Sequence, residues 1–533
     1  MILPAATHND LKTGTQTTKI KTTATAIRPG QTLRAQYPHR PPGTAKEGRD
    51  SVARGLSLST GADPNHLTKL IGADAAITLP PPQDSWSEQR LYRPFIIWSL
   101  IVALTLGFTA GAGMLMLPAL GIDRDLWWLK HAQFHGQAQI FGFAGLFTMG
   151  VAFHIVPRFR RAVPPFPIPQ QATLALIVTA VFLRSFGQAL SHRPVGPYML
   201  YASGAALLLG TLVFAGFIAV TLKRGDSSRT PVELWIASGA FWAVAAAAIH
   251  FRAMIEMGVE GTPLVNGAWE WALIYAGIFG FIVNFIFAIS TRVIVGFMNL
   301  RPGFRVFRWA ALALVNVGVA VYVAGRLVSW DQNVIGLGTI FLAVGLVSFV
   351  ISIRIFEGPT KRRPYILPAY ARYEWFVKAA YGWLVVGAVL LFVQGLEGVL
   401  GERVLPSLST APVIHVFTLG FITMMIFGLS ARMLPLFEPT TLPYRRAIDA
   451  AFVLLNVSVG LRLVFGLGSP AGADAFLALS GTAGLAALIS YSVPLFKSMR
   501  PAARAKHAKM VAGLGAERLH QIQLYRAGKL PQE

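Results

Sequence analysis

Twelve long apolar segments run through residues 92–497, and they constrain the fold more than any other feature of the sequence. Each has about 20 or more residues, which is enough for an α-helix to cross a hydrocarbon layer of roughly 30 Å. Only 13% of the residues are charged, against about 25% in a soluble domain. The sequence therefore predicts an all-α, polytopic membrane protein. The expected spans are 92–117, 131–157, 171–191, 197–222, 232–254, 268–297, 305–328, 333–356, 372–399, 411–436, 444–468 and 473–497.

Basic residues are distributed unevenly among the loops between these spans. The net charge of +23 would suit a nucleic-acid binder, but the basic residues gather in the tails and in alternate loops. The loop after the second span contains Arg158, Arg160 and Arg161, whereas the loop before it contains Arg124 and Lys130. By the positive-inside rule, both termini are predicted to be cytoplasmic. The expected partner is therefore the lipid bilayer, and nucleic acid is excluded.

The two ends of the chain differ from the apolar part. Residues 1–90 are rich in Thr, Pro, Gly, Lys and Arg and lack the apolar stretch of a signal peptide, which predicts a disordered basic arm. Residues 498–533 are predicted to form a basic cytoplasmic tail. The chain has no cysteine, which excludes disulfides, thiolate metal sites and iron–sulfur clusters.

Three of the spans share a spaced pattern. In spans two, six and ten, a Gly-Phe pair is followed by a polar residue and then by another Phe. The matched positions are Gly142, Gly280 and Gly420; His154, Arg292 and Arg432; and Phe159, Phe297 and Phe437. Self-similarity of this kind indicates an internal repeat. The sequence predicts a pseudo-three-fold repeat of a four-helix unit, with repeats at about 92–222, 232–356 and 372–497.

Histidines recur at one end of the predicted bundle. His135 and His415 begin the inward-running spans two and ten, and His131 and His250 lie at a similar depth. Metal-binding residues inside a membrane are functional hypotheses by default, so these four are the candidate metal ligands. Hydrogen bonding between helices is the alternative role for each. His154 lies about 28 Å from His135 along the same helix, which excludes it from their site.

Three arginines lie near the same end, in matching spans of the three repeats: Arg184, Arg326 and Arg462. A haem held between two histidines has two propionates, and guanidinium groups pair well with carboxylates. Snorkelling to the membrane surface is the alternative. Gln137 and Tyr275 match His415 in the other two repeats, and they complete the candidate cofactor-binding residues. The predicted cofactor is a haem, assigned as b-type.

His250, Met254 and Met257 form an H-x-x-x-M-x-x-M pattern on one helix. Imidazole and thioether groups together suit copper. Ordinary packing of the two methionines is the alternative. Copper is therefore a second candidate cofactor.

The sequence resembles the NnrS family of membrane proteins. "HGQAQIFGF" from His135 resembles the family's second span, and "HVFTLGFITMMIFGLSAR" from His415 resembles its late span. The resemblance covers residues 92–497 and implies a twelve-span bacterial inner-membrane protein that contains haem and copper and acts in the response to nitric oxide. The family's second span usually reads His-Ala-His-Glu, whereas this chain has Gln137 and Ala138 at the last two positions, with His131 as a substitute ligand.

The architecture also resembles subunit I of the haem–copper oxidases, which has twelve spans in three arcs and low-spin haem ligands in spans two and ten. The copper ligands of those oxidases lie in spans six and seven, and neither of those spans has a histidine here. An oxygen-reducing centre of that type is therefore not expected.

Three functions follow as expectations. The first is an NnrS-like haem protein linked to nitric oxide or membrane redox sensing, with a redox protein as a further partner. The second is an oxidase-like electron-transfer subunit without the binuclear centre. The third is a transporter or scaffold without a cofactor. Any catalytic activity is expected to be that of a haem-dependent oxidoreductase.

Overall fold

The computed structural model describes residues 92–162, 167–225, 230–329, 331–360, 370, 372–405, 408–437, 440, 442–468, 470, 472–501 and 503. All of them belong to one compact unit, Pro80–Glu533. The basic arm predicted at residues 1–90 and most of the basic tail predicted at residues 498–533 lie outside the described residues.

The twelve predicted spans are confirmed as twelve helices that are long and apolar enough to cross a membrane. Boundaries shift by a few residues; the second span begins at Leu126, and the fifth ends at Glu260. In chain order, the helical elements are α4 (Tyr92–Val102), η1 (Ala103–Gly107), α5 (Phe108–Ala119), α6 (Leu126–Gln137), η2 (Ala138–Gly145), α7 (Leu146–Arg160), α8 (Ile168–Ala189), α9 (Val195–Arg224), α10 (Pro231–Glu260), α11 (Gly267–Tyr275), η3 (Ala276–Ile282), α12 (Val283–Ile289), η4 (Ser290–Ile294), α13 (Val295–Phe297), α14 (Arg305–Ala324), η5 (Gly325–Ser329), α15 (Gln332–Ile353), α16 (Tyr373–Leu400), α17 (Thr410–His415), η6 (Val416–Thr423), α18 (Met424–Phe437), α19 (Arg445–Gly468) and α20 (Ala473–Ser498).

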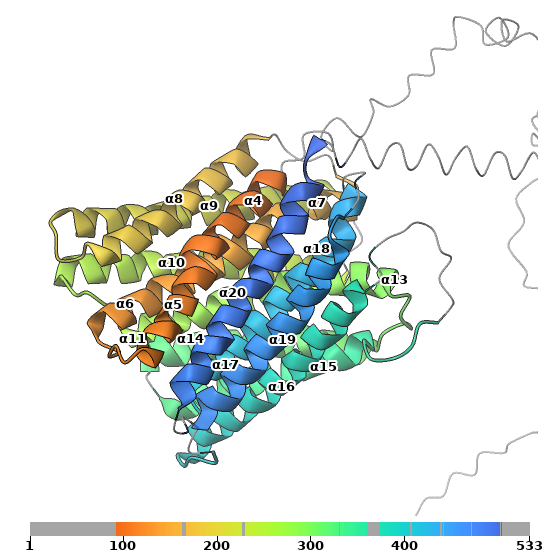
Figure 1. Ribbon diagram of the computed structural model, residues 1–533. Helices are drawn as coiled ribbons and strands as arrows, with labels where there is room; N and C mark the ends of the chain where they lie inside the picture. The colour runs from red at the N-terminus through yellow and green to blue at the C-terminus, as the bar shows by residue number, and fades with distance from the viewer. Residues whose placement is uncertain are drawn as a thin grey trace, which may run out of the picture. The chain divides into compact units, whose positions relative to one another are not determined.

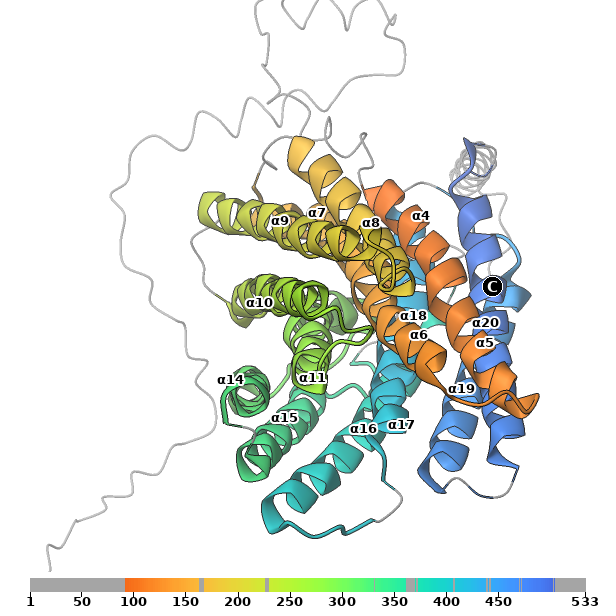
Figure 2. The ribbon, with the colours of Figure 1, turned by 90° about the vertical axis from the view of Figure 1, so that its left-hand side faces the viewer.

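The helices form a ring in which the last helix of each repeat packs against the first helix of the next. These contacts join α9 to α10, α15 to α16, and α20 to α5 (Figures 1 and 2). The second helix of each repeat lies inside: 94%, 89% and 83% of its most apolar segment is buried, against 22% for Arg445–Gly468 in the outer layer. The predicted pseudo-three-fold repeat is thereby confirmed.

The shared Gly-Phe pattern brings each inner helix close to the first helix of its own repeat. A Cβ atom on Gly142 would lie 2.5 Å from a Val102 side-chain carbon. The matching atoms on Gly280 and Gly420 would lie 2.5 and 2.8 Å from Trp242 and Trp383. Small residues let membrane helices approach closely, and here they fix each inner helix against its outer partner.

The polar and aromatic positions of the pattern join consecutive repeats. The Arg292 guanidinium lies 4.8 Å from the Phe159 ring, and that of Arg432 lies 5.3 Å from the Phe297 ring. His154 closes the set, because its ring centroid lies 4.0 Å from that of Phe437. These three contacts, called the ring clasps below, explain the spacing in the sequence. They also place His154 in an aromatic contact rather than at the predicted metal site.

Each inner helix contains a π-helical segment directly after the aligned residues Gln137, Tyr275 and His415. The three segments are η2, η3 and η6. A π-helical turn contains an extra residue, and such turns occur frequently at functional sites. In this bundle they begin at the level where the predicted ligands lie.

Candidate functional site

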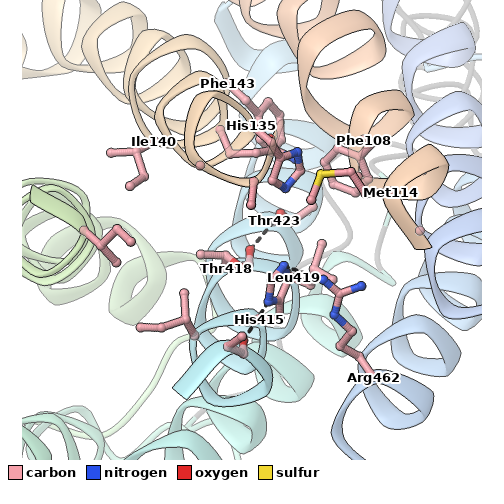
Figure 3. A pocket seen from close by; sticks show the side chains of 18 of the residues that line it. Phe108, Met114, His135, Ile140, Phe143, His415, Thr418, Leu419, Thr423 and Arg462 are labelled. Carbon is pink, nitrogen blue, oxygen red and sulfur yellow. Dashed lines mark hydrogen bonds between the residues drawn. The ribbon is translucent and has the colours of Figure 1, made fainter. Parts of the chain in front are cut away.

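A cavity of about 400 Å³ lies between the first and third repeats, and it reaches the second repeat at α11. Figure 3 shows this cavity with His135 and His415 projecting into it. Most of the lining is apolar and includes Phe108, Phe143 and Leu419. The volume falls within the usual range for small-molecule and cofactor sites, and an apolar wall with a few convergent polar groups is typical of them.

His135 enters the cavity from α6 with its ring held on two sides. Its Nδ1 lies 2.9 Å from the carbonyl oxygen of Gly107. Gly111 lies so close that a Cβ atom there would be 2.7 Å from the imidazole Cε1. With Nδ1–H donating to a carbonyl, the neutral ring has its lone pair on Nε2. This tautomer is the one that binds a metal through Nε2.

His415 enters from the end of α17 with the same arrangement. Its Nδ1 lies 2.7 Å from the carbonyl oxygen of Ala411. Its Nε2 lies 2.9 Å from Nη2 of Arg462, which comes from α19. Arginine cannot accept a hydrogen bond, so Nε2 is the acceptor and carries the lone pair. Both histidines therefore present a neutral imidazole whose Nε2 is free of a proton.

The two histidines suit a haem better than a metal ion bound by protein side chains alone. Within the described ranges, no group of three or more His, Cys, Asp or Glu residues is placed to hold a metal. Haem supplies four ligands of its own and needs only axial donors from the protein, for which histidine is common. Two oriented imidazoles in an apolar cavity meet that requirement.

The three candidate arginines have different surroundings. Arg462 lines the cavity, whereas Arg184 and Arg326 are not among its lining residues. Arg184 is 1% exposed and donates to the side chain of Gln188. Arg326 donates from Nε to the hydroxyl of Tyr322 over 3.3 Å. The structure thus brings one of the three arginines to the paired histidines.

The aligned residues Gln137 and Tyr275 also lie outside the cavity lining. Gln137 is 2% exposed, and its side-chain amide has no hydrogen-bond partner among the described residues. The orienting partner of His135 is the Gly107 carbonyl. Tyr275 stacks on Tyr322 with ring centroids 3.5 Å apart.

The remaining histidines bond within the protein. Nδ1 of His131 lies 2.7 Å from the carbonyl oxygen of Trp127, and the His131 ring does not line the cavity. His250 is fully buried, and its Nε2 lies 3.4 Å from the Ser203 hydroxyl.

The two methionines of the candidate copper pattern are buried. Met254 and Met257 pack in a small apolar cluster with Leu200 and Val265. This surrounding is the packing alternative that the sequence left open for them.

The sequence reasoning missed a carboxylate at the cavity. Glu270 lies in the first turn of α11 and lines the cavity together with His135. Span six has no histidine, the residue type on which the metal site was predicted. The available signal was an acidic residue in a membrane span at the same depth as His135.

A ring of twelve membrane-length helices, with two oriented histidines around an apolar cavity, defines the class of this protein as a polytopic membrane protein with an internal cavity. The sequence comparison agrees: the family model described as NnrS protein matches residues 91–500. The chain therefore belongs to the NnrS family, and the predicted resemblance is confirmed. Among curated proteins, none matches the chain.

Proposed function

We propose that this protein binds haem within the membrane, with His135 and His415 as the axial ligands. The observation that carries the proposal is the common orientation of the two imidazoles. Each has Nδ1 bonded to a backbone carbonyl and Nε2 unprotonated, and both line one cavity. Hydrogen bonding of the second ring nitrogen is the usual support for a metal-binding histidine.

Arg462 would hold a haem carboxylate in this arrangement. It donates to the Nε2 atom of His415, and that atom has a single lone pair. If His415 held haem iron through this lone pair, the Arg462 guanidinium would be free to pair with a propionate. A haem bound here would supply one-electron redox chemistry.

We further propose that the site serves the response to nitric oxide and nitrosative stress in a bacterial inner membrane, with both termini cytoplasmic. Membership of the NnrS family and the distribution of basic residues among the loops support this role. Electron transfer through one low-spin haem is the second candidate, and it is favoured by the same two imidazoles. Copper remains a proposed second metal, to be measured on the same preparations.

The test is haem content and the reduced-minus-oxidised spectrum of purified protein. We expect wild type to show a low-spin haem signal, and we expect His135→Ala and His415→Ala each to abolish it. His154→Ala is the matched control, because His154 lies on the same inner helix as His135 and contacts Phe437 instead. Elemental analysis of each sample determines iron and copper. A low-spin signal that survives in His415→Ala would overturn the assignment.

A further inference from the structure

Glu270 is a carboxylate at the cavity wall whose role the proposed haem site leaves open. It lies close to the ligand helix, because a Cβ atom on Gly136 would be 3.9 Å from its Oε1. Gly136 directly follows His135 in the chain. Among the residues that the structure describes, no hydrogen-bond donor and no ion-pair partner is recorded for the Glu270 carboxylate. The group therefore faces the cavity without a direct partner.

Arg184 is a buried arginine that amide side chains link to the loop before α11. Its guanidinium is buried in α8 and donates to Gln188, and its Nε has no partner within the described part of the chain. Gln188 in turn donates to Gln133 over 2.8 Å. Gln133 bonds the backbone of Val265 through both amide atoms, each over 2.9 Å. This chain of amides holds Arg184 in place and links it to the loop before α11.

Other titratable groups on the elements that pack against α11 have their own partners. Arg252 and Glu256 of α10 pair with each other over 2.9 Å. Arg326 of η5 bonds Tyr322 of α14, which stacks on Tyr275 of α11 itself. Lys130 of α6 bonds the Ser191 hydroxyl over 3.2 Å. Nδ1 of His131 and of His135 lies on a backbone carbonyl, and His250 of α10 lies beside Ser203. Glu270 is thus the carboxylate that faces the cavity.

Stabilisation of a helix start explains the position of Glu270 only in part. A negative charge in the first turn interacts favourably with the helix dipole. That effect is equal on any face of the helix, whereas Glu270 is on the face that lines an apolar cavity. A charge in such a place is costly unless it is paired. Its ionisation therefore depends on any other charge that enters the cavity.

We propose that Glu270 is the proton acceptor coupled to reduction at this cavity. When a one-electron donor reduces the ferric site, Glu270 takes up one proton from water and becomes a neutral carboxylic acid. On reoxidation it releases that proton, and no covalent bond other than O–H changes. This inference rests on the proposed haem site.

A redox titration of the purified protein over roughly pH 5 to 9 tests the proposal. One proton per electron changes the midpoint potential by about 59 mV per pH unit for a one-electron couple. We expect wild type to show a falling potential over part of this range. Glu270→Gln should abolish the slope and raise the potential at alkaline pH, because it removes a negative charge beside the iron. Glu256→Gln is the matched control, and it should keep the slope.

Infrared difference spectra add a second readout. We expect reduction to produce the C=O band of a protonated carboxyl group, and Glu270→Asp to retain that band at a shifted position. A structural role alone would change thermal stability and leave the slope and the band unaltered, which would overturn the inference. If haem is bound but the potential is independent of pH, this inference fails and the haem site stands. If no haem is bound, both fail.

Discussion

Replacing Gly111 with Ala should weaken haem binding by moving His135. Gly111 lies in α5, and its new methyl carbon would be 2.7 Å from Cε1, 3.3 Å from Nδ1 and 3.4 Å from Nε2 of the imidazole. Non-bonded carbon atoms are ordinarily about 3.5–4.0 Å apart. The ring must therefore retreat by about 1 Å toward the cavity that it lines.

That displacement removes the hydrogen bond that orients His135, while the histidine itself is retained in the sequence. The 2.9 Å contact from Nδ1 to the Gly107 carbonyl is lost, which costs about 1 kcal/mol of folding free energy. Loss of such a supporting hydrogen bond typically lowers metal affinity by about 10- to 100-fold. We expect the dissociation constant for haem to rise by this factor, with a folded and monodisperse protein.

The control variant is Gly113→Ala on the same helix. A Cβ atom at Gly113 meets nothing within 4 Å, so the same chemical change there should leave haem affinity unaltered. The assay is spectrophotometric titration of haem into cofactor-depleted protein in detergent. Equal affinities for Gly111→Ala and Gly113→Ala would refute the packing argument and remove the main structural support for His135 as a ligand.

Three further predictions concern the rest of the bundle. Arg462→Leu should lower haem retention by about 10- to 150-fold, since a charge-assisted hydrogen bond contributes about 1.5–3 kcal/mol. Arg446→Leu, at an exposed position in the first turn of α19, should not lower it; equal retention of the two variants in dialysis would point to snorkelling. Arg292→Leu should destabilise the protein by about 1–2 kcal/mol, because it removes the cation–π contact with the Phe159 ring and the 3.2 Å hydrogen bond to the Phe159 carbonyl. Thermal unfolding in detergent measures this loss. An unchanged unfolding midpoint would contradict a stabilising role of the ring clasps. A periplasm-active reporter fused after Glu533 should stay inactive, and strong activity would reverse the predicted orientation.

Much of the fold could be predicted from the sequence because few backbone structures can cross a lipid bilayer. A chain that crosses the bilayer must satisfy its backbone groups within each segment, so apolar length translates directly into helices. The repeat was also visible, because the matched Gly positions and ring clasps need particular residue types at fixed spacing. Gly142 and His154 could be aligned with their counterparts before any contact was known.

The surroundings of each candidate residue were harder to predict, because matching positions of the repeats have the same spacing in the sequence but different side-chain partners in the structure. Arg184 and Arg462 match in the alignment, yet one is buried beside Gln188 and the other reaches His415. The depth of a side chain follows from its position in a span, whereas the direction it faces depends on helix rotation and packing. Glu270 was missed for the same reason, since nothing in its span indicates which face lines the cavity.

The placement of the ligand pair has a consequence for assembly of the protein in the membrane. His135 belongs to the first repeat and His415 to the third, and the same two repeats meet at the His154–Phe437 clasp and at the packing of α20 on α5. The cofactor-type cavity therefore lies on the seam where the circle of helices closes. The cavity is therefore complete only after the third repeat has inserted into the membrane and packed against the first. A haem bound there would join the first repeat to the third. Haem binding would therefore also stabilise the closed ring of helices.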